Sequence, residues 1–202
     1  MNNEKTGTNQ DFEIIRKIIF RKIHLYGQTK VSYAHKGYKQ AAVLVPIMTV
    51  DQIPAICLTE RSQQVDHHKG QISFPGGMVD KTDRTIEETA LRETHEEIGI
   101  PECDIEIIGK LDDVYSITGY LIHPIIAEIK TLNNLKINRQ EVKNIFFIPL
   151  KWILEDKNRR MDNYLDINGM IRKVWFFSEY QGKIIWGITA SILVQLADLI
   201  NK

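Results

Sequence analysis

The sequence predicts an α/β fold in which helices flank a mixed β-sheet. Segments rich in β-branched and aliphatic residues alternate with segments whose apolar residues recur at helical spacing. The 202 residues contain no internal repeat, no low-complexity tract and no stretch with the composition of a linker. Because a chain of this length can bury a substantial core, we expect one main domain over residues 39–202, preceded by a helical extension over residues 1–38.

The N-terminal part of the chain contains one expected helix and two expected strands. Residues 11–23 predict an amphipathic helix. Its isoleucines gather on one side: Ile14, Ile15, Ile18, Ile19 and Ile23. Residues 39–50 and 55–60 predict strands that are joined by a turn at Asp51 and Gln52.

The best-defined element is a helix that begins after Thr85 and ends before Gly99. Thr85 followed three residues later by Glu88 is a capping-box pattern, and Gly99 suits the position that follows a helix. At ~100° per residue, the helix has an apolar face beside an acidic one. The apolar face holds Ala90, Leu91, Thr94 and Ile98, and the acidic face holds Glu93, Glu96 and Glu97.

The three clustered glutamates favour a metal site. Like charges at these spacings repel by a few tenths of a kcal/mol in water. Glu97 lies at the border of the apolar face, and the partial burial expected there raises a carboxyl pKa. A divalent cation would turn this repulsion into attraction. The alternative is a solvated acidic face with an Arg92–Glu96 pair, but the glycine pair that follows Phe74-Pro75 just upstream favours the metal site.

The C-terminal half of the chain is expected to complete the sheet and cover it. The later elements are strands over residues 105–111, over 121–129 and around Phe147, a short helix over 149–155, and a hairpin of 171–178 with 183–186. Residues 184–200 predict a core-packing helix with apolar residues at helical spacing. A membrane span is the alternative, but the run is short for one and contains Gln195 and Asp198.

Composition excludes several classes of function. The 26 acidic and 26 basic side chains give a formal net charge of zero, whereas nucleic-acid-binding surfaces show a basic excess. Two cysteines form no disulfide framework, and Cys57, in an apolar strand pattern, is expected to be a buried thiol. Residues 1–9 are polar and lack the apolar centre of a signal peptide. We expect a cytoplasmic protein that binds neither nucleic acid nor membrane.

The glutamate-rich helix and the glycines before it resemble the Nudix box, which reads Gly, a spacer, then Arg-Glu-x-x-Glu-Glu-x-Gly. The matching residues are Gly77, Arg92, Glu93, Glu96, Glu97, Gly99 and Ile100. The resemblance implies a Nudix-type α/β/α sandwich with a mixed β-sheet, plus the N-terminal helix. The spacer is one residue longer than usual. Asp83 and Arg84 stand where the family has a glutamate, and Thr94 replaces an aliphatic residue.

The segment before the box resembles the signature of the coenzyme A pyrophosphatase branch. Residues 57–62 (Cys-Leu-Thr-Glu-Arg-Ser), Gly70 and residues 74–77 (Phe-Pro-Gly-Gly) stand at the expected spacing, and the likeness continues over roughly residues 40–200. Asp66 replaces an arginine of the signature, which would be a natural partner for a phosphate. Three interpretations are open. The missing positive charge could come from His67, His68 and Lys69; the substrate specificity could have moved away from coenzyme A; or the two histidines could simply lie in an exposed loop.

The resemblance also implies a cation and roles for individual residues. Mg²⁺ or Mn²⁺ prefers oxygen ligands, which Glu93, Glu97 and Glu96 would supply with the main-chain carbonyl of Gly76 or Gly77. Arg92 would orient Glu93 and offset its charge. The general base is Glu93 or, alternatively, Glu141. The substrate-binding candidates are Arg61, Ser62, His67, His68, Lys69, Gly70, Phe74 and Gly76.

The function implied by the resemblance is hydrolysis of a pyrophosphate linkage. Coenzyme A or its thioesters would give 3′,5′-ADP and 4′-phosphopantetheine or its acyl form. The first alternative, motivated by Asp66, is another nucleoside diphosphate derivative such as a dinucleotide or nucleotide sugar. The second is a non-catalytic nucleotide-binding module, which predicts degraded glutamates. The family resemblance is compatible with a monomer or a homodimer.

Overall fold

The computed structural model describes residues 5–26, 37–62, 70–166 and 169–201. Within these residues, eight strands form one mixed sheet and two more form a separate hairpin. The sheet strands are β1 (Lys39–Val50), β2 (Ile53–Arg61), β3 (Ile72–Ser73), β4 (Gly76–Met78), β5 (Ile105–Lys110), β6 (Val114–Tyr115), β7 (Tyr120–Ile129) and β8 (Val142–Pro149). The helices are α1 (Lys5–Tyr26), α2 (Ile86–Ile98), α3 (Leu150–Leu154) and α4 (Gly187–Asn201), with short 3-10 turns at Glu102–Asp104 and Asp156–Asn158.

The long strand β1 organises the sheet. It pairs in parallel with β7 and in antiparallel with β2, and its first half also pairs with β4. The predicted turn between β1 and β2 is confirmed. Asp51 and Gln52 have φ values of 47° and 67°, the left-handed conformation that a tight two-residue hairpin of this kind needs.

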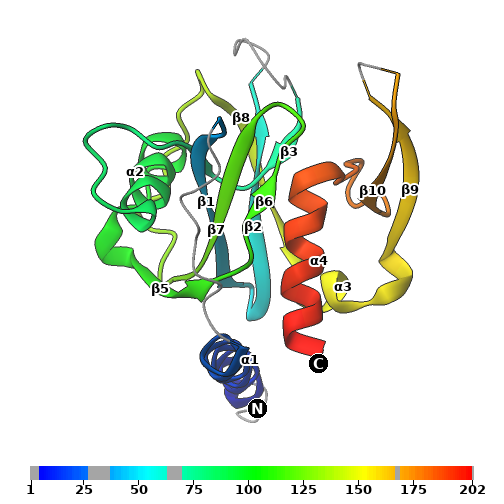
Figure 1. Cartoon of the computed structure of the whole chain (residues 1–202). Coiled ribbons are helices and arrows are strands. Elements are labelled where there is room, and N and C mark those ends of the chain that lie inside the picture. The colour runs from blue at the N-terminus through cyan, green and yellow to red at the C-terminus, as the bar shows by residue number, and fades with distance from the viewer. Residues whose placement is uncertain (1–4, 27–36, 63–69, 167–168, 202) are drawn as a thin grey trace.

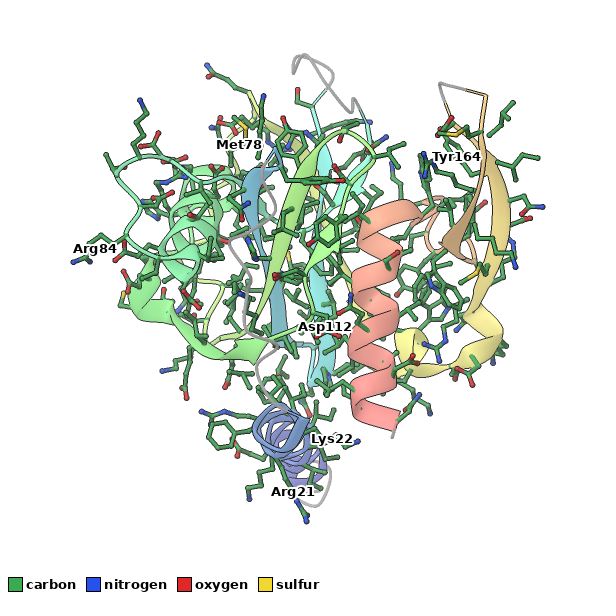
Figure 2. The ribbon with its side chains drawn as sticks, in the orientation of Figure 1. Arg21, Lys22, Met78, Arg84, Asp112 and Tyr164 are labelled. Carbon is green, nitrogen blue, oxygen red and sulfur yellow. The ribbon has the colours of Figure 1, made fainter. Side chains whose placement is uncertain are left out.

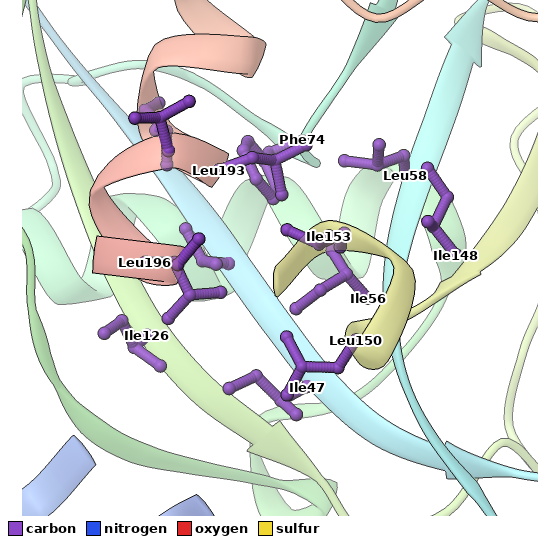
Figure 3. Close-up of a cluster of buried hydrophobic side chains, with 14 of the residues drawn as sticks. Ile47, Ile56, Leu58, Phe74, Ile126, Ile148, Leu150, Ile153, Leu193 and Leu196 are labelled. Atoms are coloured by element: carbon purple, nitrogen blue, oxygen red, sulfur yellow. The ribbon is translucent and has the colours of Figure 1, made fainter. Parts of the chain in front are cut away.

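Helices cover both faces of the sheet, which confirms the predicted α/β/α layering. Figure 1 shows the strands between α2 on one side and α4 with α3 on the other, while α1 lies below the sheet. Successive residues of β1 serve opposite faces: Leu44 packs in the cluster under α2, and Val45 in the larger cluster under α4. Figure 3 shows the larger cluster, where Ile47, Ile56 and Ile126 of the sheet meet Leu193 and Leu196 of α4.

The helix α4 is a core helix, as predicted. Its buried residues follow the apolar periodicity of the sequence: Thr189, Ala190, Ile192, Leu193, Val194, Leu196 and Ala197. Within the described part of the chain, no helix combines the length and apolar character that crossing a membrane requires.

Two predicted features of the fold differ in the structure. The strand β10 (Ile171–Phe177) forms its ladder with β9 (Arg159–Leu165). The predicted hairpin with residues 183–186 is present only in part, as antiparallel bridges of Phe176 with Trp186 and of Tyr180 with Lys183. The sequence did not indicate β9, because most side chains of this strand are polar and exposed and therefore show no alternation of apolar and polar residues. In α1, Ile19 is buried as expected, but Ile14 is 51% exposed and Phe12 takes a core position.

Candidate active site

Both ends of α2 are fixed by the capping residues that the sequence predicted. The Thr85 hydroxyl accepts a hydrogen bond from the Glu88 backbone N–H at 3.1 Å. The Glu88 carboxylate accepts from Arg84, through its backbone N–H at 2.7 Å and its Nε at 2.8 Å, and not from the Thr85 N–H of a regular capping box. Gly99 ends the helix with a φ of 75°, and its N–H donates to the His95 carbonyl. The helix register that aims the glutamates is therefore set locally.

Glu97 is buried more completely than the expected partial burial, with 2% of its surface exposed. Its Oε1 lies 3.6 Å from Arg61 Nη1, and its Oε2 has no hydrogen-bond partner among the described residues. Burial raises the pKa of Glu97 to about 8, although the Arg61 charge acts in the opposite direction. A buried carboxylate oxygen without a donor is costly, so this position suits a cation.

The two glycines of β4 let the main chain approach α2 and β1. A Cβ at Gly77 would lie 2.4–2.5 Å from the carboxylate atoms of Glu93, closer than any side chain permits. At Gly76, φ is 152° and a Cβ would lie 2.3 Å from the Ala42 carbonyl oxygen. Gly77 therefore lets the Glu93 carboxylate lie against the backbone, since a side chain there would displace it, and Gly76 lets β4 lie against β1.

Arg92 organises the exposed side of the glutamate cluster. Its Nη1 donates to Glu93 at 2.9 Å and to Glu96 at 3.1 Å, and its Nη2 donates to the Met78 carbonyl. Figure 2 places Met78 near the upper ends of the central strands. Burial raises the pKa of Glu93, while the Arg92 hydrogen bond opposes that rise. The Arg92–Glu96 pair that the alternative reading proposed is present within this network.

Asp83 is a partner of Arg92 that the sequence did not reveal. Its carboxylate accepts from Arg92 Nε at 3.0 Å and from Nη2 at 2.9 Å, a bidentate pair. These hydrogen bonds hold the pKa of Asp83 well below its usual range. Thr89 also donates to the Asp83 carboxylate at 2.9 Å. The longer spacer and the absent glutamate were the features of the sequence that could have indicated this pair, because a carboxylate at a shifted position can still bind Arg92.

Glu141 lies close to the buried glutamates. Its charge contributes to the raised pKa of both Glu93 and Glu97. The loop is fixed because the Ser62 backbone N–H donates to the Glu141 carbonyl at 2.7 Å. The Glu141 side chain accepts from Asn138 Nδ2 at 3.0 Å. Residues of β2, α2 and the loop before β8 therefore meet in one place.

The other predicted binding residues have different surroundings. The N–H of Gly70 donates to the Arg61 carbonyl at 3.2 Å, so Gly70 lies beside the end of β2. Phe74 is 3% exposed and packs in the core cluster under α4. Asp66, His67, His68 and Lys69 lie outside the described residues.

The described residues contain no ready-made cluster of three His, Cys, Asp or Glu side chains that would enclose a metal ion. Glu93 and Glu96 are turned towards Arg92. The unpartnered Oε2 of Glu97 and the buried carboxylate of Glu93 nevertheless have the chemistry that a hard divalent cation needs. The carboxylates of Glu93 and Glu97 therefore fit a cation, with Glu96 at the exposed edge.

A mixed sheet between helices, with a glutamate-rich helix packed against a glycine pair, is the arrangement that the Nudix resemblance implies, and the comparison with known families agrees. Residues 38–166 match the NUDIX domain, so the chain belongs to the Nudix hydrolase family. Enzymes of this family generally use divalent metal ions and act on small-molecule nucleotide substrates.

Relatives of similar length support the assignment. The chain is 40% identical over 162 residues to the uncharacterized Nudix hydrolase NudL of Pectobacterium atrosepticum, covering 79% of this chain and 81% of that protein. It is 42% identical over 163 residues to NudL of Klebsiella pneumoniae, with the same coverage. A MutT/nudix family protein from Enterococcus faecalis superposes with a TM-score of 0.51 at 14% identity, over 90% of this chain and 69% of that chain, and shows the shared fold.

Proposed function

We propose that this Nudix hydrolase cleaves the pyrophosphate linkage of coenzyme A or its thioesters. Water would attack one phosphorus atom and the bridging P–O bond would break, giving 3′,5′-ADP and 4′-phosphopantetheine or its acyl form. The observation that carries this proposal is the contact of Arg61 with Glu97, 3.6 Å apart. It joins the segment that resembles the coenzyme A branch to the buried glutamate of the Nudix box.

The site offers a second feature that suits a pyrophosphate. Arg61 Nε is buried without a hydrogen-bond partner among the described residues. A buried guanidinium donor of this kind matches a phosphate oxygen in geometry and charge. Arg61 would therefore bridge Glu97 and the substrate, which gives the arginine of the pre-box segment a direct role in binding.

Each residue of the site has a proposed task. Glu93 and Glu97, with Glu96, would hold Mg²⁺ or Mn²⁺, and the Gly77 carbonyl would be a further ligand. When bound, the cation offsets phosphate charge and lowers the pKa of a water. Arg92 positions Glu93 and limits the repulsion among the carboxylates. The glycine pair brings the main chain of β4 up to Glu93.

We propose Glu141 as the general base. Its carboxylate accepts a hydrogen bond from the neutral Asn138 amide, whereas the Glu93 carboxylate is engaged by Arg92 and is assigned to the cation. Glu141 is therefore the carboxylate of this group that is left to accept a proton from water. Glu141 also lies near enough to Glu93 and Glu97 to raise the pKa of both. If Glu93 serves as the base instead, Glu141→Gln retains most of the activity at all pH values.

Asp66 motivates the second candidate, hydrolysis of another nucleoside diphosphate derivative. It reverses the charge at a position where the coenzyme A signature has arginine, and it lies outside the described residues.

A non-catalytic binding module receives no support from the site, because all three glutamates of the box are in place on α2. We further propose residues 39–202 as the catalytic unit. A cytoplasmic setting suits the two free cysteines, of which Cys57 is buried.

The experiment that tests the proposal is product analysis of coenzyme A incubated with the protein and Mg²⁺ or Mn²⁺. ADP-ribose, NADH and diadenosine polyphosphates serve as competing substrates, and Glu97→Gln as the inactive control. The proposal predicts 3′,5′-ADP from coenzyme A faster than any other cleavage, with turnover largely lost in the control. Cleavage of another compound with coenzyme A untouched would refute the coenzyme A assignment and implicate Asp66.

A further inference from the structure

Two lysines meet at a buried carboxylate beside the candidate active site. Glu60, at the end of β2, has a side chain that is 6% exposed. Its Oε1 accepts from Lys143 Nζ at 2.8 Å, and its Oε2 accepts from Lys183 Nζ at 2.9 Å. Although burial acts to raise the pKa of Glu60, the two lysines outweigh it and hold that pKa below its ordinary value. The carboxylate therefore stays ionised and keeps both ammonium groups together.

The fold builds this pair from three separate segments. The register between β2 and β8 shifts at this point, because Glu60 pairs with Asn144 and Arg61 with Val142. Lys143 is the extra residue of this bulge, and a bulge re-aims side chains. Lys183 comes from the turn between β10 and α4, where Tyr180 and Lys183 exchange backbone hydrogen bonds.

The pair has an excess of positive charge that faces solvent. One carboxylate is shared by two ammonium groups, so the cluster carries a net charge of +1. The side chains of Lys143 and Lys183 are 55% and 35% exposed, and Glu60 is the one acceptor that the described residues offer to either ammonium. Each ammonium has three donors, so both can bind a further anion. Arg139, whose guanidinium donates to the Lys143 carbonyl, adds another cation nearby.

The lysine pair is connected to the candidate active site through neighbouring residues. Glu60 precedes Arg61, which contacts Glu97, and Lys143 follows two residues after Glu141. The backbone hydrogen bond from Ser62 to Glu141 joins the two segments. The glutamates and the lysines thus lie at the same end of β2. Successive residues of a strand face opposite sides of the sheet, so Glu60 lies on the side of α4 and Arg61 on the side of α2. A substrate with a second anionic group that crosses this end of β2 could contact both.

We propose that Lys143 and Lys183, held by Glu60, bind a terminal phosphomonoester of the substrate, separate from the pyrophosphate that is cleaved. This inference rests on the proposed function, because the substrate it fits is a nucleoside diphosphate derivative that also carries a phosphomonoester. A phosphomonoester has a charge of about −1.5 to −2 at pH 7 and three acceptor oxygens, which match two adjacent ammonium groups. Coenzyme A has such a group on its ribose, whereas dephospho-coenzyme A does not.

The test compares coenzyme A with dephospho-coenzyme A for the wild type, Lys143→Gln and Lys183→Gln. Each substitution should raise KM for coenzyme A by about tenfold and leave KM for dephospho-coenzyme A and kcat unchanged. Lys130→Gln is the matched control, because Lys130 is 52% exposed and also pairs with a glutamate, Glu106, at 3.1 Å. The Lys130→Gln variant should leave KM for both substrates unchanged. An equal rise in KM for both substrates in the lysine variants, or an equal KM for both substrates in the wild type, would overturn the proposal.

A binding measurement separates this inference from the proposed function. Titration calorimetry with 3′,5′-ADP and with 5′-AMP needs no turnover. The wild type should bind 3′,5′-ADP about tenfold more tightly than 5′-AMP. Both lysine variants should bind the two nucleotides with similar affinity. If coenzyme A is not cleaved but the preference is present and lysine-dependent, the proposed function fails and the phosphomonoester site stands. Lys143→Arg, which keeps a cation on Glu60, should retain the preference and serves if a glutamine variant unfolds. Loss of the preference in the folded arginine variant, or its absence in the wild type, would contradict the proposal.

Discussion

Replacing Glu97 with glutamine should make the metal-free protein more stable, and increasingly so as the pH rises. Glutamine has the shape of a protonated glutamate but cannot ionise. The folded-state pKa of Glu97, about 8, is raised above its ordinary value of 4.5. A raised carboxyl pKa means that the stability it contributes is fully present below pH 4.5 and is lost as the pH rises through about 8.

The size of this effect follows from the two pKa values. Each pKa unit corresponds to about 1.4 kcal/mol of difference between protonation states. Between pH 5.5 and pH 8.5, ionisation of Glu97 should therefore cost the wild type about 3 kcal/mol of unfolding free energy that Glu97→Gln does not lose. The few tenths of a kcal/mol expected for like charges on a solvated helix are smaller by an order of magnitude, because the carboxylate is buried.

The assay is urea unfolding of both proteins in EDTA at pH 5.5, 7.0 and 8.5. The measured quantity is the difference in unfolding free energy between the variant and the wild type at each pH, which cancels the titration of other groups. Adding Mg²⁺ at pH 8.5 should stabilise the wild type and leave the variant unchanged, because the cation offsets the buried charge. A difference that stays constant with pH would show that Glu97 is not a buried titrating group.

Three further substitutions test the arrangement around α2. Gly77→Ala should lower kcat by about a hundredfold with little loss of stability, because the added Cβ displaces the Glu93 carboxylate; an alanine variant with normal kcat would contradict this close approach. Asp83→Asn should lower kcat by roughly tenfold through a less firmly held Arg92, whereas the exposed Asp80→Asn should not; equal effects of the two would exclude a positioning role. Gly99→Ala should reduce the unfolding free energy by about 1–3 kcal/mol, measured in urea, because φ is 75° and a Cβ would lie 2.8–2.9 Å from Lys136. Unchanged stability would mean that the left-handed end of α2 is not required.

Local signals in the sequence predicted much of the fold. Thr85 and Gly99 act on their own helix, so their patterns predicted both ends of α2 correctly. The turn at Asp51 and Gln52 was recognisable because a short hairpin depends on its own residues. The layering of the sheet followed from the alternation of apolar segments, which reflects burial directly.

Features that depend on distant partners were less accessible from the sequence. The strand β9 is polar, and only its pairing with β10 makes it a strand. The sequence showed only that Asp83 stands near the position where the family has a glutamate. Its bidentate contact with Arg92 depends on the path of the loop between β4 and α2. The complete burial of Glu97 depends on the packing of α2 against the sheet. Helical periodicity could place Glu97 at a border but could not show what covers it.

The most direct test of the proposed active site is whether Glu97 and Glu93 hold a divalent cation. Binding of Mn²⁺ can be measured by electron paramagnetic resonance for the wild type, Glu97→Gln, Glu93→Gln and the exposed control Glu102→Gln, without any substrate. We expect the wild type and the Glu102 variant to bind Mn²⁺ alike, and both Glu97→Gln and Glu93→Gln to lose most of that affinity. Wild-type affinity in folded Glu97→Gln protein would contradict the proposed metal site.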